Sequence, residues 1–182
     1  MIALVRHGLS AHVHAGLVDL DGYQRWRDAY EAAGIDPREV PPSALQELAI
    51  RCGALVASDS PRASQSAQLL APQREVVTSP LLRELELSPP NLRGIRLPLL
   101  GWAVAIGLRG ALRRADATEL ARVRAAADWL VALADTHGDV VVVTHAMIRA
   151  KLADELQSRG MQRTVPRGRM RHRSAWELRR PL

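Results

Sequence analysis

Four consecutive valines constrain the fold of this chain more than any other feature. Val140–Val143 form an unbroken β-branched run, which is typical of a strand buried on both faces, and Thr144-His145 follow at once. A second apolar run, Met1–Val5, opens the chain and leads into Arg6-His7-Gly8. In parallel sheets the carboxyl ends of the strands carry ligand-binding side chains. Two histidines and one arginine at such ends therefore predict an anion site.

Short apolar strands alternate with helical segments along the chain, which favours an α/β fold. We expect strands at 1–6, 54–57, 75–78 and 140–144, a last antiparallel edge strand at 174–178, and helices at 23–33, 43–51, 61–72, 116–136 and 147–158, with a loop at 9–22. These elements predict a three-layer sandwich with a mostly parallel central sheet and helices on both faces. With no repeat or linker, 1–182 is expected to form one domain.

Local capping signals place an arginine at a helix start. Ser60 is a good N-cap residue and Pro61 a good first helical residue, so Arg62 is expected in the first turn, beside unpaired backbone N–H groups that favour anions. Ser43 is expected to cap the preceding helix and Asp116 a later one. The structural alternative for Arg62 is a surface salt bridge, and the Pro61 context favours anion binding.

Composition excludes several classes of protein. The single cysteine, Cys52, excludes an internal disulfide and is expected to be a small buried residue. No signal peptide or membrane span is predicted, because charged residues interrupt the opening run and 97–108 is too short, so we expect a cytoplasmic protein with no membrane partner. The net charge is +6, and many of the cations follow Gly160. Nucleic-acid binding is one interpretation of those arginines, and we favour a solvated basic tail because no nucleic-acid motif accompanies them.

Four motifs occur in order: Leu4-Val5-Arg6-His7-Gly8, Ser58-Asp59-Ser60-Pro61-Arg62, Leu82-Arg83-Glu84-Leu85 and Val143-Thr144-His145-Ala146. Together they resemble the signature of the histidine phosphatase superfamily, which has the phosphoglycerate-mutase-like fold. The resemblance is dispersed over residues 1–150. It implies a phosphomonoester hydrolase that needs no metal ion and no other cofactor.

The resemblance also implies roles for the matched residues. His7 is the expected nucleophile, which forms a phosphohistidine that water resolves. Arg6, Arg62 and His145, the last if protonated, are expected to bind the phosphoryl group and stabilise its charge. Glu84 matches the family's proton donor. Glu86 is the rival for that role, since both side chains of an extended segment point the same way.

Two departures separate the chain from well-studied branches of that family. Many members have an asparagine six residues after the nucleophile, where this chain has Val13; His12 or His14 are candidates to replace it. The mutase-type segment after Glu84 is also missing, which argues against phosphoglycerate mutase activity. The substrate is therefore open between a small metabolite phosphate and a phosphoprotein, and a non-catalytic phosphate-binding or regulatory relative remains the alternative.

Residues 88–115 are apolar and proline-rich, and no family motif explains them. The stretch from Leu97 to Leu108 is expected to form a helix over the site. One hypothesis makes it a lid that gives the leaving-group pocket an apolar wall. Ordinary core packing and a contact in a homodimer are equal alternatives, and the sequence leaves the oligomeric state open.

Overall fold

A six-stranded sheet forms the centre of the molecule. A computed structural model describes residues 1–12, 16–112, 116–164 and 172–181. In spatial order the strands are β3 (Val77–Ser79), β2 (Ala54–Ser58), β4 (Val140–Thr144), β1 (Ile2–Arg6), β6 (Ala175–Arg179) and β5 (Gln162–Arg163). The first four are parallel, whereas β6 runs antiparallel to β1 and β5 antiparallel to β6. This confirms the predicted α/β class with its mostly parallel sheet.

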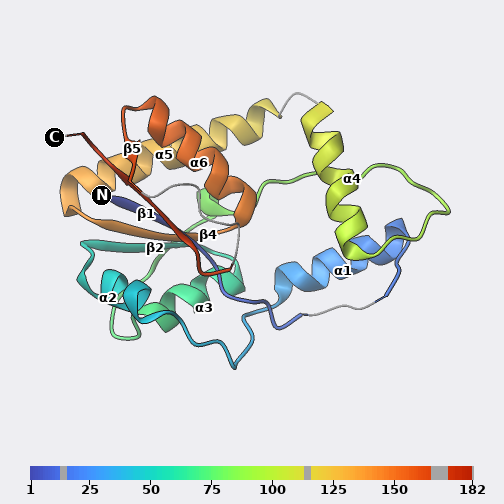
Figure 1. Cartoon of the computed structure of the whole chain (residues 1–182), viewed down its shortest axis with the longest axis horizontal. Helices are drawn as coiled ribbons and strands as arrows, with labels where there is room; N and C mark the ends of the chain where they lie inside the picture. Colours follow the sequence, from blue (N-terminus) through green and yellow to red (C-terminus); the bar gives the residue numbers. More distant parts are fainter. Residues whose placement is uncertain (13–15, 113–115, 165–171, 182) are drawn as a thin grey trace.

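Helices cover both faces of the sheet and one of its ends. On one face lie α5 (Ala117–His137) and α6 (Ala146–Ser158), and on the other α2 (Ser43–Arg51) and α3 (Pro61–Leu70) (Figure 1). Two further helices, α1 (Leu20–Ala32) and α4 (Leu99–Leu112), lie together beyond the carboxyl ends of the parallel strands. A 3₁₀ turn, η1 (Pro80–Leu82), follows β3.

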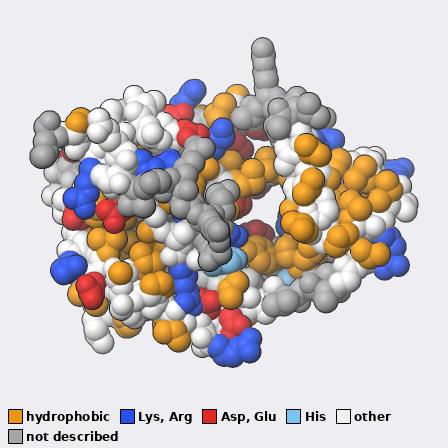
Figure 2. Space-filling model, viewed as in Figure 1, with side chains coloured by type: hydrophobic (Ala, Val, Ile, Leu, Met, Phe, Trp, Pro, Cys, Tyr) orange, Lys and Arg blue, Asp and Glu red, His pale blue; other side chains and the backbone are white. Residues whose placement is uncertain are grey.

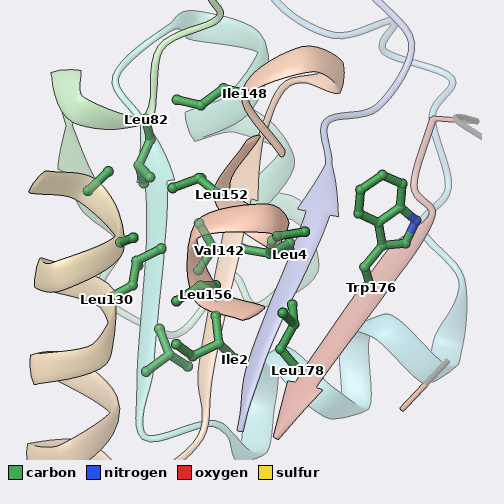
Figure 3. Close-up of a cluster of buried hydrophobic side chains, with 14 of the residues drawn as sticks. Ile2, Leu4, Leu82, Leu130, Val142, Ile148, Leu152, Leu156, Trp176 and Leu178 are labelled. Atoms are coloured by element: carbon green, nitrogen blue, oxygen red, sulfur yellow. The ribbon is translucent and has the colours of Figure 1, made fainter. Parts of the chain in front are cut away.

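The alternation of side chains along each strand divides the apolar core between the two faces. Ile2 and Leu4 of β1 pack with α5 and α6, as Figure 3 shows, whereas Ala3 and Val5 pack with α2 and α3. The valines of β4 divide in the same way, and all are buried. Two covered faces are the physical reason for the unbroken apolar runs.

A third, smaller apolar cluster joins α1 to α4. Its buried members are Tyr23, Trp102 and Ile106. Trp102 is fully buried, stacks on Tyr23 with ring centroids 5.2 Å apart, and donates its indole N–H to the Val18 carbonyl at 3.0 Å. The helix expected over 97–108 therefore exists, as α4, and Trp102 attaches it to α1.

Some expected boundaries were wrong for local reasons. The 9–22 loop is shorter than expected because Asp19 accepts the Gly22 N–H and starts α1 at Leu20. Pro42, not Ser43, is the N-cap of α2, and β3 begins two residues later than expected. The last strand is β6, but β5 pairs outside it and forms the edge. Ser60 and Asp116 are N-caps as predicted.

Several sequence-based expectations concern the ends and the surface of the chain. Cys52 is buried, and burial raises the pKa of its thiol. Of the arginines after Gly160, Arg173 pairs with Glu39 and Arg180 with Asp135, while residues 167, 169 and 171 lie outside the described part. No helix among the described residues is long and apolar enough to cross a membrane.

Candidate active site

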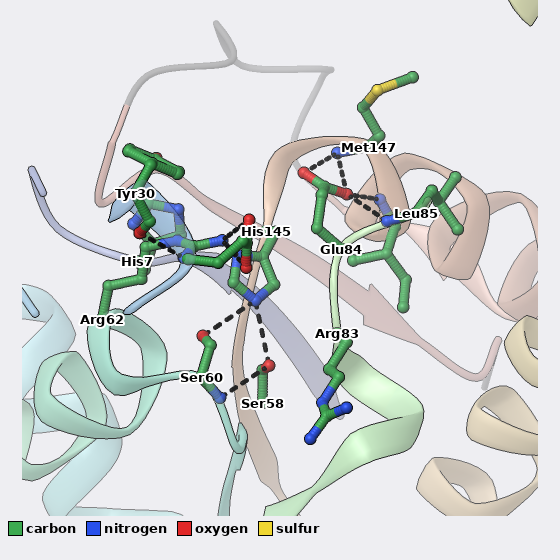
Figure 4. Close-up of polar contacts among 12 residues, drawn as sticks. His7, Tyr30, Ser58, Ser60, Arg62, Arg83, Glu84, Leu85, His145 and Met147 are labelled. Atoms are coloured by element: carbon green, nitrogen blue, oxygen red, sulfur yellow. Dashed lines mark hydrogen bonds and ion pairs between the residues drawn. The ribbon is translucent and has the colours of Figure 1, made fainter. Parts of the chain in front are cut away.

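The register of two parallel strands brings the predicted histidines together. β1 and β4 pair Arg6 with Thr144, so the next residues, His7 and His145, leave the sheet side by side. Their ring centroids are 5.1 Å apart, and the side chains lie near each other in Figure 4. His7 is 2% exposed and His145 1% exposed. Both predicted histidines therefore belong to one buried site.

The hydrogen bond of His7 determines which ring nitrogen is reactive. Nδ1 lies 2.7 Å from the Gly8 carbonyl oxygen, which can only accept, so Nδ1 carries the proton and Nε2 has a free lone pair. The pKa of His7 is lowered to about 3, mainly by burial and further by the neighbouring groups Arg62, His172 and Arg6. The imidazole is thus neutral at physiological pH, as a nucleophile must be.

Arg62 is held in a fixed position at the start of α3. Its guanidinium is 1% exposed, and Nη2 donates to both carboxylate oxygens of Glu31 at 2.9 and 3.1 Å. Nη1 donates to the Tyr30 carbonyl at 3.1 Å, and the guanidinium lies 4.5 Å from the Tyr30 ring centroid. The guanidinium expected to bind an anion therefore binds a carboxylate from α1.

Arg6 belongs to the same electrostatic environment. Burial is the main cause that lowers the pKa of its guanidinium, and the positive charge of Arg62 contributes in the same direction. The phenol of Tyr30 and the carboxylate of Glu84 act in the opposite direction. Buried Arg62 and partly buried Arg6 beside a neutral histidine form a site suited to a multiply charged anion.

His145 is neutral in this site, so the positive charge that it could supply if protonated is not present here. Nδ1 lies 3.2 Å from Arg62 Nη2, which can only donate, so Nδ1 is the acceptor and Nε2 carries the proton. That Nε2–H points to the hydroxyls of Ser58, at 3.0 Å, and Ser60, at 3.2 Å. Burial, followed by Arg62 and His7, lowers the pKa of His145 to about 2. It can contribute a hydrogen bond but not a charge.

The carboxylate of Glu84 lies at the N-terminus of α6. It accepts the backbone N–H groups of Met147, at 3.2 Å, and Ile148, at 2.9 Å, as the dashed lines in Figure 4 show. Glu86 is exposed, and it does not contribute to the pKa of Arg6 as Glu84 does. Glu84 therefore lies against α6 and near Arg6, whereas Glu86 faces solvent, and the role of Glu84 as proton donor stays a prediction.

Two side chains from neighbouring elements hold the Glu84 segment in place. Arg122 of α5 donates to the carbonyls of Leu81, Arg83 and Glu84 at 2.9 to 3.3 Å. Thr144, the residue before His145, donates its hydroxyl to the Leu82 carbonyl at 2.7 Å. The positions of Glu84 and His145 are thus coupled through a buried hydrogen bond.

Sequence reasoning missed four residues of the site: Tyr30, Glu31, Arg122 and His172. The Nδ1 atom of His172 lies 3.1 Å from the carbonyl oxygen of His7, and the centroids of the two rings are 5.3 Å apart. No motif marks these residues, since each reaches the site from a distant element. Ser58, to which no role was assigned, follows the strand predicted at 54–57, and its place on the same edge of the sheet could have indicated a role in the site.

The candidates for the missing asparagine have different outcomes. His12 lies with its ring centroid 6.1 Å from that of Trp26, and no described contact joins it to Arg62. Val13 and His14 fall outside the described residues. Among the residues that are described, no group of three or more His, Cys, Asp and Glu side chains is arranged to hold a metal ion.

Solved structures of known proteins share this fold. A Bombix mori ecdysone phosphate phosphatase in complex with tungstate matches at a TM-score of 0.57 and 13% identity, covering 99% of this chain and 92% of that one. A mycobacterial glucosyl-3-phosphoglycerate phosphatase matches at a TM-score of 0.54 and 20% identity, covering 97% of this chain and 95% of that one. A phosphoglycerate mutase from Bacillus anthracis matches at a TM-score of 0.52 and 18% identity, covering 87% of this chain and 80% of that one.

These matches define the class to which the fold belongs. The matched proteins are members of the histidine phosphatase superfamily, and this chain has the fold of that superfamily. At such low identities the likeness concerns the fold, and the residues of the site have to carry any statement on activity. No family model matches the chain, and no curated protein matches its sequence.

Proposed function

We propose that this chain is a cytoplasmic phosphomonoester hydrolase that acts through a phosphohistidine on His7, without a metal ion or other cofactor. One observation carries the proposal: His7 directs its Nδ1–H to the Gly8 carbonyl, which leaves Nε2 unprotonated in a site that contains Arg6 and Arg62. A neutral imidazole beside two fixed positive charges is what attack on a phosphoryl group requires. The phosphatases of the same fold support this class of reaction.

In the first step of the proposed reaction, Arg6 and Arg62 bind the phosphoryl oxygens. Nε2 of His7 attacks phosphorus as the bond to the leaving oxygen breaks. Glu84, in its protonated form, gives its proton to that oxygen, so that a neutral alcohol departs. His145 helps to position Arg62, because its Nδ1 accepts a hydrogen bond from Arg62 Nη2. Binding of the anion raises the pKa of both histidines, because its negative charge favours their protonated forms and offsets the charges of the two arginines.

In the second step, water resolves the phosphohistidine. The Glu84 carboxylate takes a proton from the attacking water, and the bond between phosphorus and Nε2 breaks. Inorganic phosphate leaves, and His7 is again neutral. Glu84 therefore alternates between acid and base, which requires it to lie close to the leaving oxygen and then to the water.

The fold leaves the identity of the substrate open. The related structures are named for chemically different substrates, ecdysone phosphate and glucosyl-3-phosphoglycerate. A small phosphorylated metabolite and a phosphoprotein both remain within the proposal. What selects between them is the cavity that adjoins Glu84 and His145.

The proposal is tested with p-nitrophenyl phosphate from mildly acidic to neutral pH in the presence of a chelator. Wild type should hydrolyse the ester, and His7→Ala should lose at least about 10³-fold in kcat, because the nucleophile is removed. His137→Ala, which changes an exposed histidine at the end of α5, is the matched control and should retain full activity.

Three results would contradict the proposal. Activity that persists in His7→Ala would mean that another group is the nucleophile. Activity that disappears with chelator and returns with a divalent ion would mean that the reaction uses a metal. If the wild type hydrolyses no phosphate ester but binds inorganic phosphate, the chain is a phosphate-binding relative.

A further inference from the structure

A large cavity adjoins the candidate active site on the side of the predicted proton donor. Its volume is about 690 Å³, and it extends from His145 and Glu84 to α1 and α4. Figure 2 shows the molecule hollowed between the body of the sheet and α4. Cavities of this size hold drug-sized organic molecules, and a phosphate group alone would fill only a small part of it. The space therefore suits the part of a substrate that lies beyond the phosphorus.

Aromatic side chains form the α1 wall of this cavity. Tyr23, Trp26 and Tyr30 all line it. The Trp26 and Tyr30 rings are stacked with centroids 5.1 Å apart, and Trp102 stacks on Tyr23 from the side of α4. The chain has only four Trp, two Tyr and no Phe, so four of its six aromatic side chains belong to this one stack. Such a concentration favours flat, apolar ligands.

Aliphatic side chains complete the apolar lining. Leu85 and Leu87 enter from the segment after Glu84, and Ile106 enters from α4. Ile106 is 8% exposed and belongs to the same cluster as Tyr23 and Trp102. Apolar groups thus approach the cavity from three separate parts of the fold, which is the composition of a pocket for an organic group.

The charges of the cavity disfavour a second anionic group on the ligand. Two cations are among the described residues that line it, and both are already paired: the Arg83 guanidinium lies 2.6 Å from the Asp59 carboxylate, and that of Arg27 lies 3.6 Å from Asp28. The lining carboxylates outnumber these cations: Asp28, Glu31, Asp59, Glu84 and Glu86. A carboxylate or second phosphate on the leaving group would be repelled there.

We infer that this cavity is the leaving-group subsite, and that it selects phosphate monoesters of bulky, uncharged, ring-containing alcohols. The inference rests on the proposed function, because it assigns the cavity to the alcohol that Glu84 protonates. Trp26 of α1 and Ile106 of α4 are then specificity-determining residues. The helix α4 supplies an apolar wall through Ile106, while Trp102 supports that wall from behind.

The test compares esters whose leaving alcohols have similar basicity, so that intrinsic reactivity does not decide the result. We would measure kcat/KM for 2-(1-naphthyl)ethyl phosphate, ethyl phosphate and 3-phosphoglycerate. The kcat/KM for the naphthyl ester should exceed that for ethyl phosphate by at least about 10-fold, because the cavity buries the apolar surface of the naphthyl rings away from water. For 3-phosphoglycerate, kcat/KM should be no higher than for ethyl phosphate.

Matched variants connect this preference to the cavity. Ile106→Ala should lower the ratio of naphthyl to ethyl ester by about 5-fold or more, because it removes apolar contact from the wall. Val104 lies on the exposed side of α4 and is 56% exposed, so Val104→Ala should leave the ratio of naphthyl to ethyl ester unchanged. If Ile106→Ala does not fold, Leu87→Ala provides the same test from another segment.

A binding measurement separates failure of this inference from failure of the proposed function. His7→Ala is titrated with both alkyl esters by isothermal titration calorimetry. Turnover without preference for the naphthyl ester, or a ratio that Ile106→Ala does not change, overturns the inference. If no ester is hydrolysed but the naphthyl ester binds at least 10-fold more tightly, the proposed function is wrong and the apolar subsite is supported. No turnover with equal binding refutes both.

Discussion

At the scale of single residues, charge balance dominates the candidate site. Arg62 is buried, and a buried guanidinium without a partner would be costly to desolvate. Glu31 provides that partner through two hydrogen bonds, although its own side chain is half exposed. A phosphate that binds Arg62 Nη2 has to displace this carboxylate. Glu31 is therefore expected to compete with substrate.

Removing the charge of Glu31 should strengthen phosphate binding. In Glu31→Gln we expect the inhibition constant for inorganic phosphate to fall about 3- to 10-fold, because the anion no longer displaces a carboxylate from Arg62. The measurement is competitive inhibition of p-nitrophenyl phosphate hydrolysis. Asp21→Asn removes a charge from the exposed first turn of the same helix and should have little effect. An inhibition constant that is unchanged or higher in Glu31→Gln would refute the competition.

At the scale of elements, α1 and α4 form a unit of their own at the end of the sheet. Their shared cluster of Tyr23, Trp102 and Ile106 is separate from the two clusters on the sheet faces. Trp102 contributes both ring stacking and a hydrogen bond to this cluster. Local stability in proteins follows such units, so this part of the fold can open without unfolding of the sheet.

The variant Trp102→Ala tests that independence. We expect it to destabilise the packing of α4 on α1 by about 3–5 kcal/mol, the usual cost of truncating a buried tryptophan. Hydrogen exchange of the amides in α1 and α4 should accelerate, while exchange in β1 and β4 should change much less. Leu108→Ala, which is 61% exposed on the same helix, is the control. Equal acceleration in all elements would mean that the molecule opens as one unit.

At the scale of the whole molecule, the buried histidines make stability depend on pH. The pKa of His7 is lowered to about 3 and that of His145 to about 2, in both cases mainly by burial. In the unfolded chain each imidazole takes up its proton near pH 6.5. Below that pH the unfolded state binds more protons than the folded state, so stability is lost as the pH falls.

The expected loss is measurable by urea unfolding. Between pH 6.5 and 4.5 each of these histidines should lower the free energy of unfolding by roughly 2–3 kcal/mol. In His7→Asn the loss of unfolding free energy over this pH interval should be smaller by the contribution of one histidine. His137→Asn changes an exposed histidine of α5 and should behave as wild type does. The account fails if His7→Asn and wild type lose the same stability over this pH interval.

Much of the local structure could be predicted, because its causes are local. The apolar runs at Met1–Val5 and Val140–Val143 became β1 and β4, and the Ser60-Pro61 signal began α3 where expected. Boundaries failed where one side chain decided them, as Asp19 does for α1. The predicted site residues at strand ends were found together because parallel strands end on one edge.

The sequence by itself thus determined the α/β class and the placing of Arg6, His7 and His145 at the ends of strands, since strand periodicity and helix caps act over a few residues. Only the tertiary structure decided that β1 pairs with β4 in the register that brings the histidines together. The same holds for Glu31 on Arg62 and for the stack of Trp102 on Tyr23. These contacts join residues 31 to 138 positions apart, and such long-range pairs depend on the packing of the whole chain, so no local pattern encodes them.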